Sequence, residues 1–374
     1  MKNRYFFQPY FLISLLFFSC VDPVEPEFEF KEGLVFIEGF ASTAPGASFV
    51  IINKSETQFG VNTTVFETGA TVTFRNSDTG ETTGLIENGD AYVPPADFVV
   101  SVGQRWELDI TLIDGTQYKS SPEIVLEPIP IAEAKATFSP ELRFNQSLDR
   151  FEPGHSISVT LDDPENQENF YYWTYRSFEN LTICKTCGES VFRDGECITS
   201  PAPTPDYFNY SCETDCWKIR FPENINIFSD EFSNGRVTSD LQVATIPLYN
   251  KEDIVVELQQ FSLTPAAYDY YKVLKDIVDN SGGFNAPPPA ALIGNLSNVN
   301  DAEDFVFGRF TAVATRTVSI FIDRTNIPAE VIEVALPLEF EPTIASPHPP
   351  PATTIAPCTE TRFRTAIQPE GWIN

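Results

Sequence analysis

Short runs of alternating apolar and polar residues dominate the first third of the chain. Residues 70–75 alternate cleanly and end in a turn-forming Asn-Ser-Asp-Thr-Gly stretch. Residues 106–112 follow the same period of two up to an Asp-Gly dipeptide, which is typical of a β-hairpin turn. Strands at such regular spacing, separated by turn signals, predict an immunoglobulin-like β-sandwich over residues 33–130.

Prolines at positions 122, 128 and 130 interrupt this pattern and predict a domain boundary near residue 130. Beyond it, residues 155–161 and 170–175 are rich in β-branched and aromatic side chains, which favours strands. We therefore expect residues 131–374 to form a second, larger β-rich domain, and the whole protein to be mainly β.

One helix is predicted within this second domain, over residues 264–280. Thr264 is a favourable N-cap residue, and Pro265 suits the first helical position. Apolar residues then recur at intervals of three and four until an Asn-Ser-Gly-Gly stretch ends the pattern.

The N-terminus reads as an export signal. Residues 1–19 combine two basic residues with an apolar core that is too short to cross a bilayer. They end at a serine before Cys20, as in a bacterial lipobox, so we expect a lipoprotein signal peptide and lipidation of Cys20. An ordinary signal peptide is the alternative. Residues 20–32 are acidic and proline-rich, which predicts an extended tether.

Six cysteines remain after Cys20, and five of them lie in a cysteine-rich insertion at residues 180–216. An even number in an exported protein favours disulfides, with at least one bridge leading from the insertion to the C-terminal tail. A zinc site built from the C-x2-C and C-x3-C spacings is the alternative, and a redox C-x-x-C motif is a weaker one. The six candidates are Cys184, Cys187, Cys197, Cys212, Cys216 and Cys358.

Charge and composition exclude several classes of function. The formal net charge of −29 disfavours binding to nucleic acid and to anionic membrane surfaces. Two histidines exclude a histidine-rich metal centre, and the sequence has no nucleophile elbow, P-loop or dinucleotide fingerprint. Acidic clusters at residues 162–166 and 298–304 offer oxygen ligands for Ca²⁺, but neither matches an EF-hand, and solvated turns are the favoured interpretation. We expect no cofactor and no metal.

Aromatic side chains are the candidates for contact with a ligand or partner. Tyr172 and Trp173 are neighbours on one predicted strand and must therefore face opposite sides of the sheet. Tyr268 lies on the predicted helix, and Phe284 opens a rigid proline-rich segment. Packing in the core or between domains is the favoured alternative for the tyrosines and the tryptophan, because aromatic residues dominate core burial.

Several segments, taken in order, resemble the hallmark pattern of domain-of-unknown-function family 4249, a group of Bacteroidota outer-membrane lipoproteins. These segments are residues 34–39, 69–72, 106–120, 262–271, 284–290, 294–298 and 306–310. Members are typically encoded beside TonB-dependent receptors, so the resemblance implies an accessory role at an outer-membrane uptake or signalling complex. It implies no catalytic residues.

We therefore expect a non-enzymatic lipoprotein of the outer membrane, facing the cell surface, that acts as an assembly partner of a TonB-dependent receptor. The first alternative is direct capture of a glycan or peptide by exposed aromatic side chains. The second alternative is a cell-surface hydrolase that uses paired carboxylates, since carboxylates are abundant in the sequence.

Overall fold

The computed structural model describes residues 32–146, 148–165, 167–199, 205–280, 292, 294–333, 337–342 and 354–373. Across these residues the protein is mainly β, with one helix, as the sequence predicts. None of the helical segments described is both long and apolar enough to span a lipid bilayer. The signal peptide, Cys20, most of the predicted tether and Phe284 lie outside the described residues.

The N-terminal region forms short antiparallel strands that curl around one apolar core. Its strands are β1 (Val35–Ser42), β2 (Phe49–Gln58), β3 (Val61–Phe66), β4 (Thr71–Asn76), β5 (Thr82–Asn88), β6 (Ala91–Val93), β7 (Arg105–Thr111), β8 (Gln117–Ser120) and β9 (Glu123–Ile124). The alternating residues of β4 and β7 point inward, with Phe74 and Leu108 fully buried. These two strands are the ones that the alternating pattern predicts most clearly.

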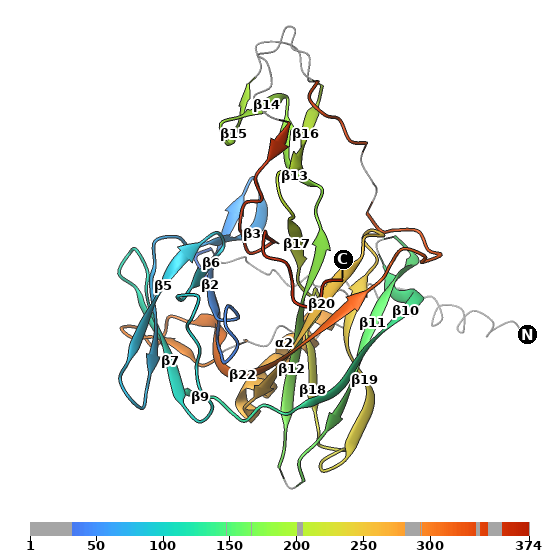
Figure 1. Cartoon of the computed structure of the whole chain (residues 1–374). Coiled ribbons are helices and arrows are strands. Elements are labelled where there is room, and N and C mark those ends of the chain that lie inside the picture. Colours follow the sequence, from blue (N-terminus) through green and yellow to red (C-terminus); the bar gives the residue numbers. More distant parts are fainter. Residues whose placement is uncertain are drawn as a thin grey trace, which may run out of the picture.

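Residues 33–130 do not complete this sheet by themselves. Strand β22 (Val306–Ile322) pairs in parallel with β1, and β21 (Leu296–Asn298) pairs with β8. Phe310 of β22 is fully buried in the N-terminal core beside Phe74, at a ring-centroid distance of 5.6 Å. The second half of β22 pairs instead with a strand of the C-terminal region, so this one strand joins the two regions into a continuous sheet, as Figure 1 shows.

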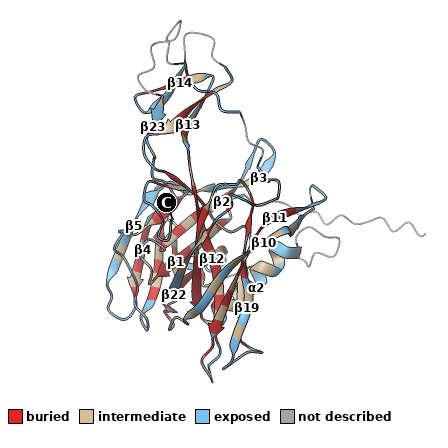
Figure 2. Ribbon diagram, turned by 45° about the vertical axis from the view of Figure 1, so that its right-hand side comes forward, coloured by how far each residue is buried: buried red, intermediate tan, exposed pale blue. Residues whose placement is uncertain are grey.

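The C-terminal region is a sandwich of two sheets. Strands β12 (Phe170–Asn180), β17 (Trp217–Arg220), β18 (Asn226–Ser229), β20 (Ile254–Leu263) and β24 (Arg364–Thr365) extend the large sheet beyond β22. Strands β10 (Ile131–Asn145), β11 (Arg150–Asp162) and β19 (Val237–Pro247) form the facing sheet. Trp173, Val256 and Leu258 are buried between the two sheets. Figure 2 shows this burial concentrated on the central strands.

Helix α2 (Pro265–Asn280) follows β20 and covers part of the opposite face of the large sheet. The Thr264 hydroxyl accepts a hydrogen bond from the Ala267 backbone N–H at 3.3 Å, which confirms Thr264 as the N-cap. Ala267 and Tyr271 are buried against Phe261 and Val313 of the sheet. The prediction of a helix at this position is confirmed.

The cysteine-rich insertion projects away from the sandwiches, as Figure 1 shows. We call this unit the Cys-rich arm. It comprises β13 (Ile183–Gly188), β14 (Ser190–Arg193), β15 (Glu196–Thr199), β16 (Tyr207–Cys212) and β23 (Ile355–Ala356). Strand β23 comes from the C-terminal tail and pairs in parallel with β16. The arm therefore combines two segments of the chain that lie far apart in the sequence.

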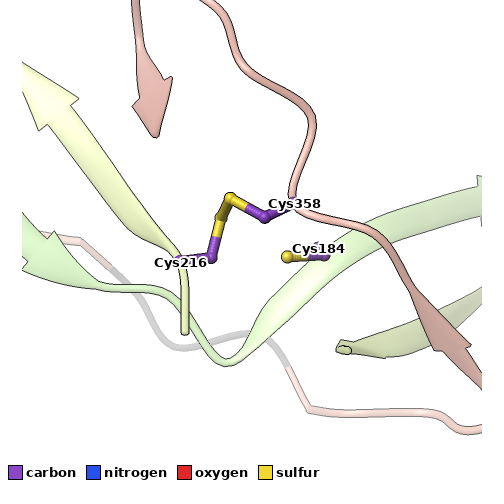
Figure 3. Close-up of side chains that lie close together, drawn as sticks. All are labelled: Cys184, Cys216 and Cys358. Atoms are coloured by element: carbon purple, nitrogen blue, oxygen red, sulfur yellow. A yellow bond between two sulfur atoms is a disulfide. The ribbon is translucent and has the colours of Figure 1, made fainter. Parts of the chain in front are cut away.

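Three disulfides cross-link the Cys-rich arm and confirm the disulfide prediction. They join Cys184 to Cys212, Cys187 to Cys197 and Cys216 to Cys358. The last bridge ties the C-terminal tail to the insertion, as cysteine counting predicts. Figure 3 shows Cys184 beside the Cys216–Cys358 bridge, and the three sulfur atoms lie within 4.8 Å of one another. Because all six sulfurs are in disulfides, no thiolate is left for the zinc alternative.

Candidate functional site

The two faces of the large sheet have different surroundings. On β12, Trp173 and Tyr175 point into the core of the C-terminal sandwich, whereas Tyr172, Thr174 and Arg176 point to the other side. Trp173 is 1% exposed, as the favoured interpretation of core packing predicts, so its candidate role as a contact residue for a ligand is wrong. The alternation rule requires opposite faces for Tyr172 and Trp173, but it does not say which face is the core.

A cleft of about 770 Å³ lies on the face that carries Tyr172. Residues of β1, β12 and β20 line its floor, and the loop before β2 forms one wall. The C-terminal segment at residues 360–370 forms another wall. The cleft is therefore built where the N-terminal region, the C-terminal sandwich and the tail meet. Its volume lies within the range of small-molecule binding sites in proteins.

Aromatic rings form a continuous group along one side of the cleft. The Phe40 ring lies 5.4 Å from that of Phe49, 5.3 Å from that of Phe261 and 6.2 Å from that of Tyr172, measured between centroids. Tyr172 also stacks on Tyr271 of helix α2 at 4.9 Å. The helix thus supports this aromatic group from outside the cleft. Phe40 and Phe261 are buried, so the half-buried rings of Phe49 and Tyr172 are the ones that offer stacking and apolar contact to a ligand.

Glu38 brings an unpaired carboxyl group into the cleft. In the described part of the chain it makes neither a hydrogen bond nor an ion pair, and its side chain is accessible from the cavity although protein surrounds it. Burial raises the pKa of the Glu38 carboxyl, and the Arg362 guanidinium partly opposes this shift. Burial, together with the nearby charge of Glu38, also raises the pKa of Tyr172. An unpaired polar group at such a place is suited to receive a hydrogen bond from a ligand.

Arg176 and Glu257, two other charged groups of the cleft, are paired with each other. Arg176 donates two hydrogen bonds to Glu257 Oε1, at 2.9 and 2.7 Å, and Gln259 donates a third to the same atom at 2.7 Å. These contacts fix the polar part of the floor. Glu38 is therefore chemically distinct from Glu257, because Glu257 has its partners inside the protein.

Arg362 gives the tail wall a positive charge. Its guanidinium lies 4.9 Å from the ring centroid of Phe221 and 5.6 Å from those of Phe49 and Phe363. Its Nη1 lies 3.5 Å from Asp90 Oδ2. These contacts attach the tail to both the N-terminal region and the C-terminal sandwich, and so hold this wall in place.

Among the residues selected from the sequence, the structure brings only Tyr172 to the cleft. Tyr268 on helix α2 packs against Phe170 at a centroid distance of 4.8 Å, and Phe284 lies outside the described residues. Sequence reasoning missed Glu38, although a lone acid within an apolar strand was a usable signal. It also missed Arg362, because nothing in the sequence indicates that the tail returns to the sheet.

Across the described ranges, the fold and its cleft define a mainly β protein with one helix and a disulfide-linked arm. The sequence profile described as "Domain of unknown function (DUF4249)" matches residues 21–319. The chain therefore belongs to that family, and the family assignment from the sequence segments is confirmed. No match was found among curated proteins or among solved structures.

Proposed function

We propose that the protein is a binding protein that captures a short glycan or peptide in the cleft. The observation that carries this proposal is the 770 Å³ cleft, in which an aromatic group lies beside the unpaired carboxyl of Glu38. Aromatic faces bind the apolar faces of sugar rings and side chains, while a free carboxylate accepts hydrogen bonds from hydroxyl or amino groups. The role that we propose is binding, and it includes no catalytic step.

Binding arrays test this proposal directly. Purified protein is applied to arrays of glycans and short peptides, and any ligand found is measured by calorimetry. Tyr172→Ala is expected to weaken the affinity about fivefold or more, because a stacking contact is worth about 1 kcal/mol or more. Phe305→Ala is the matched control, since Phe305 is an exposed aromatic residue that does not line the cleft. Binding that Tyr172→Ala leaves unchanged contradicts the proposal.

An accessory role beside a TonB-dependent receptor is a second proposal, and the β2–β3 hairpin favours it. At its tip Phe59 is fully exposed and has a φ of 51°, a conformation that is costly for a bulky residue. An aromatic ring held out in this way is suited to insert into a partner protein. Crosslinking in native outer membranes, followed by mass spectrometry, should recover a receptor with wild-type protein and less of it with Phe59→Ser.

Attachment through Cys20 belongs to the same proposal, because a lipid would hold the protein at the outer membrane facing the cell surface. Mass spectrometry of the mature N-terminus should find a diacylglyceryl-modified Cys20. The Cys20→Ala variant should lose this modification and leave the membrane fraction. An unmodified N-terminus in the wild-type protein would count against lipidation.

A further inference from the structure

A second cavity lies at the base of the Cys-rich arm, and all of its charged lining residues are basic. Its volume is about 530 Å³, and it is bordered by β13, the turn between β14 and β15, β17 and the C-terminal tail. Lys185, Lys218 and Arg364 line it, and no aspartate or glutamate of the described residues does. The chain has 53 acidic residues and only 24 basic ones, so this lining departs from the average charge of the protein. We call this cavity the basic pocket.

The C-terminal tail separates the basic pocket from the cleft. Arg362 and Ile367 of the tail line the cleft, whereas Phe363 and Arg364 line the basic pocket. Among the described residues, Thr361 alone lines both cavities. The basic pocket is therefore a distinct site on the other side of the same segment.

Two of the three cations of the pocket are brought together by the register of the sheet. Lys218 of β17 and Arg364 of β24 are direct cross-strand partners. The adjacent partners Trp217 and Thr365 are buried on one face, so Lys218 and Arg364 point to the other face and reach the pocket. Like charges directly opposite each other on a sheet are destabilising. An anion bound between the two side chains would offset this repulsion.

Two of the basic side chains have no acidic partner within the protein. Arg364 Nη1 donates a hydrogen bond to the Cys184 carbonyl oxygen at 2.7 Å, and within the described residues this guanidinium forms no ion pair. In the same part of the chain the ammonium group of Lys185, which is exposed, makes neither a hydrogen bond nor an ion pair. Both side chains can therefore donate hydrogen bonds to a ligand.

Lys218 also keeps its donors available, although two carboxylates lie near it. Its Nζ atom is 3.8 Å from Glu179 Oε1 and 3.8 Å from Glu333 Oε1, and both distances are too long for hydrogen bonds. Arg220 is the closer partner of both acids, at 2.5 Å from Glu179 and 2.9 Å from Glu333. The ammonium group of Lys218 is therefore held near the pocket without being satisfied by it.

Disulfides fix the walls of the basic pocket. Cys184 lines the pocket and is bonded to Cys212, and Cys358 lies in the tail segment that forms another wall and is bonded to Cys216. Figure 3 shows Cys184 next to the bridge between Cys216 and Cys358. Donors on a cross-linked framework are already positioned, which reduces the entropy that a ligand must lose them on binding.

The size of the basic pocket indicates a ligand larger than a bare ion. A volume of about 530 Å³ lies within the range of small-molecule sites. Phe192 and Phe363 add apolar surface to the lining, and Thr359 and Thr361 add hydroxyl groups. A lining of this kind suits the ring of a sugar, which has both apolar faces and hydroxyl groups.

We infer that the basic pocket binds a small sugar that carries a phosphate or carboxylate group. Lys218 and Arg364 would bind the oxyanion between them, and Lys185 would add a third positive charge at the opening. Hydrogen bonds between ionised groups are shorter and stronger than those between neutral groups, so the oxyanion would dominate recognition. This site is independent of the function proposed for the cleft.

Isothermal titration calorimetry of the intact, disulfide-bonded protein tests the site with three ligands that share one ring. These are glucose 6-phosphate, glucuronate and glucose. We expect at least one of the two anions to bind about tenfold more tightly than glucose, or better. The tighter anion identifies the preferred group as phosphate or carboxylate. Anions that bind no more tightly than glucose would overturn the inference.

Substitutions then locate the bound anion. Arg364→Gln should weaken its affinity about tenfold or more, and Lys185→Gln about threefold. The Lys185 variant keeps the test valid if Arg364→Gln does not fold, because Lys185 is exposed and its ammonium group makes no contact within the described residues. Lys272→Gln is the matched control, since Lys272 is an exposed lysine of α2 that does not line the pocket.

Tyr172→Ala separates the basic pocket from the cleft, because Tyr172 lines only the cleft. This variant should bind the anion as tightly as wild-type protein does. An anion affinity that falls in Tyr172→Ala, but stays unchanged in Lys185→Gln and Arg364→Gln, would place the anion in the cleft and overturn the inference. Equal affinity in all of the variants would overturn it as well.

Discussion

The C-terminal sandwich buries more apolar side chains in its core than the Cys-rich arm does. The sandwich packs two sheets around a core that contains Trp173, Tyr171 and Leu258. The apolar cluster of the arm is smaller, and half-cystines supply much of it, with Phe192, Phe208 and Tyr210 as its largest members. A small unit cannot bury enough apolar surface to be stable alone, and disulfides compensate for this. Packing therefore stabilises the sandwich, and covalent bonds stabilise the arm.

The two regions nevertheless meet at the cleft, since the tail leaves the arm at Cys358 and then forms the wall that carries Arg362. The tail continues along the large sheet as β24, which pairs with β17. The covalent bonds of the arm thus fix one end of a segment that the sandwich needs to complete its site. A substitution in the core of the sandwich should lower the free energy of unfolding. Loss of the bridge that holds the tail should lower that free energy and also weaken ligand binding.

The largest effect is expected from Trp173→Ala, which removes one of the largest fully buried side chains of the sandwich. The variant should lose about 3 to 5 kcal/mol of unfolding free energy, because it loses buried apolar surface and leaves a cavity. Urea unfolding followed by circular dichroism measures this loss. Phe232→Ala is the control: Phe232 is 90% exposed and its replacement should change stability by less than about 0.5 kcal/mol. Equal losses from both variants would contradict the assignment of Trp173 to the core.

Next in size is the loss of the bridge that joins the arm to the tail. The double variant Cys216→Ser and Cys358→Ser opens a loop with a sequence separation of 142, and about 2 to 5 kcal/mol should be lost. The separation in the Cys187–Cys197 bridge is only 10, so the corresponding double variant should lose less. Only the first variant should also weaken ligand binding, because only that bridge fixes the cleft wall. Equal affinity in both variants would show that the tail stays in place without its bridge.

Acid should destabilise the sandwich through His155. Burial, aided by the positive charge of Arg324, lowers the pKa of His155 from 6.5 to about 4. The folded state therefore favours the neutral ring. The stability that this provides is complete above pH 6.5 and is lost as the pH falls from 6.5 towards 4, by about 3 kcal/mol in total. Denaturant unfolding of wild-type and His155→Gln proteins between pH 7 and 4 measures the difference. Parallel pH profiles would show that His155 does not titrate in this range.

The sequence predicts local structure better than it predicts the site. Strand β4 and helix α2 follow from patterns within a few residues, since alternation and N-capping act over that range. The pairing of β1 with β22 could not be predicted in this way, because a parallel pair needs a long connection whose path no local pattern specifies. Glu38 and Arg362 meet at the cleft only after that pairing and the Cys216–Cys358 bridge have formed. The number and positions of the cysteines predict a bridge from the insertion to the tail, but nothing in the sequence predicts the pairing of β1 with β22.

The smallest effect on stability, and the most informative about the cleft, is expected from Glu38→Gln. The pKa of Glu38 is raised in the folded state, so the ionised carboxylate opposes folding. The protonated carboxyl favours the folded state at pH values below the ordinary pKa of glutamate. This stability is lost as the pH rises through the raised pKa of the folded protein. At pH 7 the glutamine variant should therefore melt slightly higher than wild type while binding ligand more weakly. Glu133→Gln is the control, because Glu133 is an exposed acid on β10 away from the cleft. A side chain that lowers the stability of the folded protein, as the ionised Glu38 does, is expected where the side chain serves ligand binding rather than packing. If Glu38→Gln instead lowered the melting temperature and left binding intact, Glu38 would be part of the framework and the cleft would lack its distinguishing polar group.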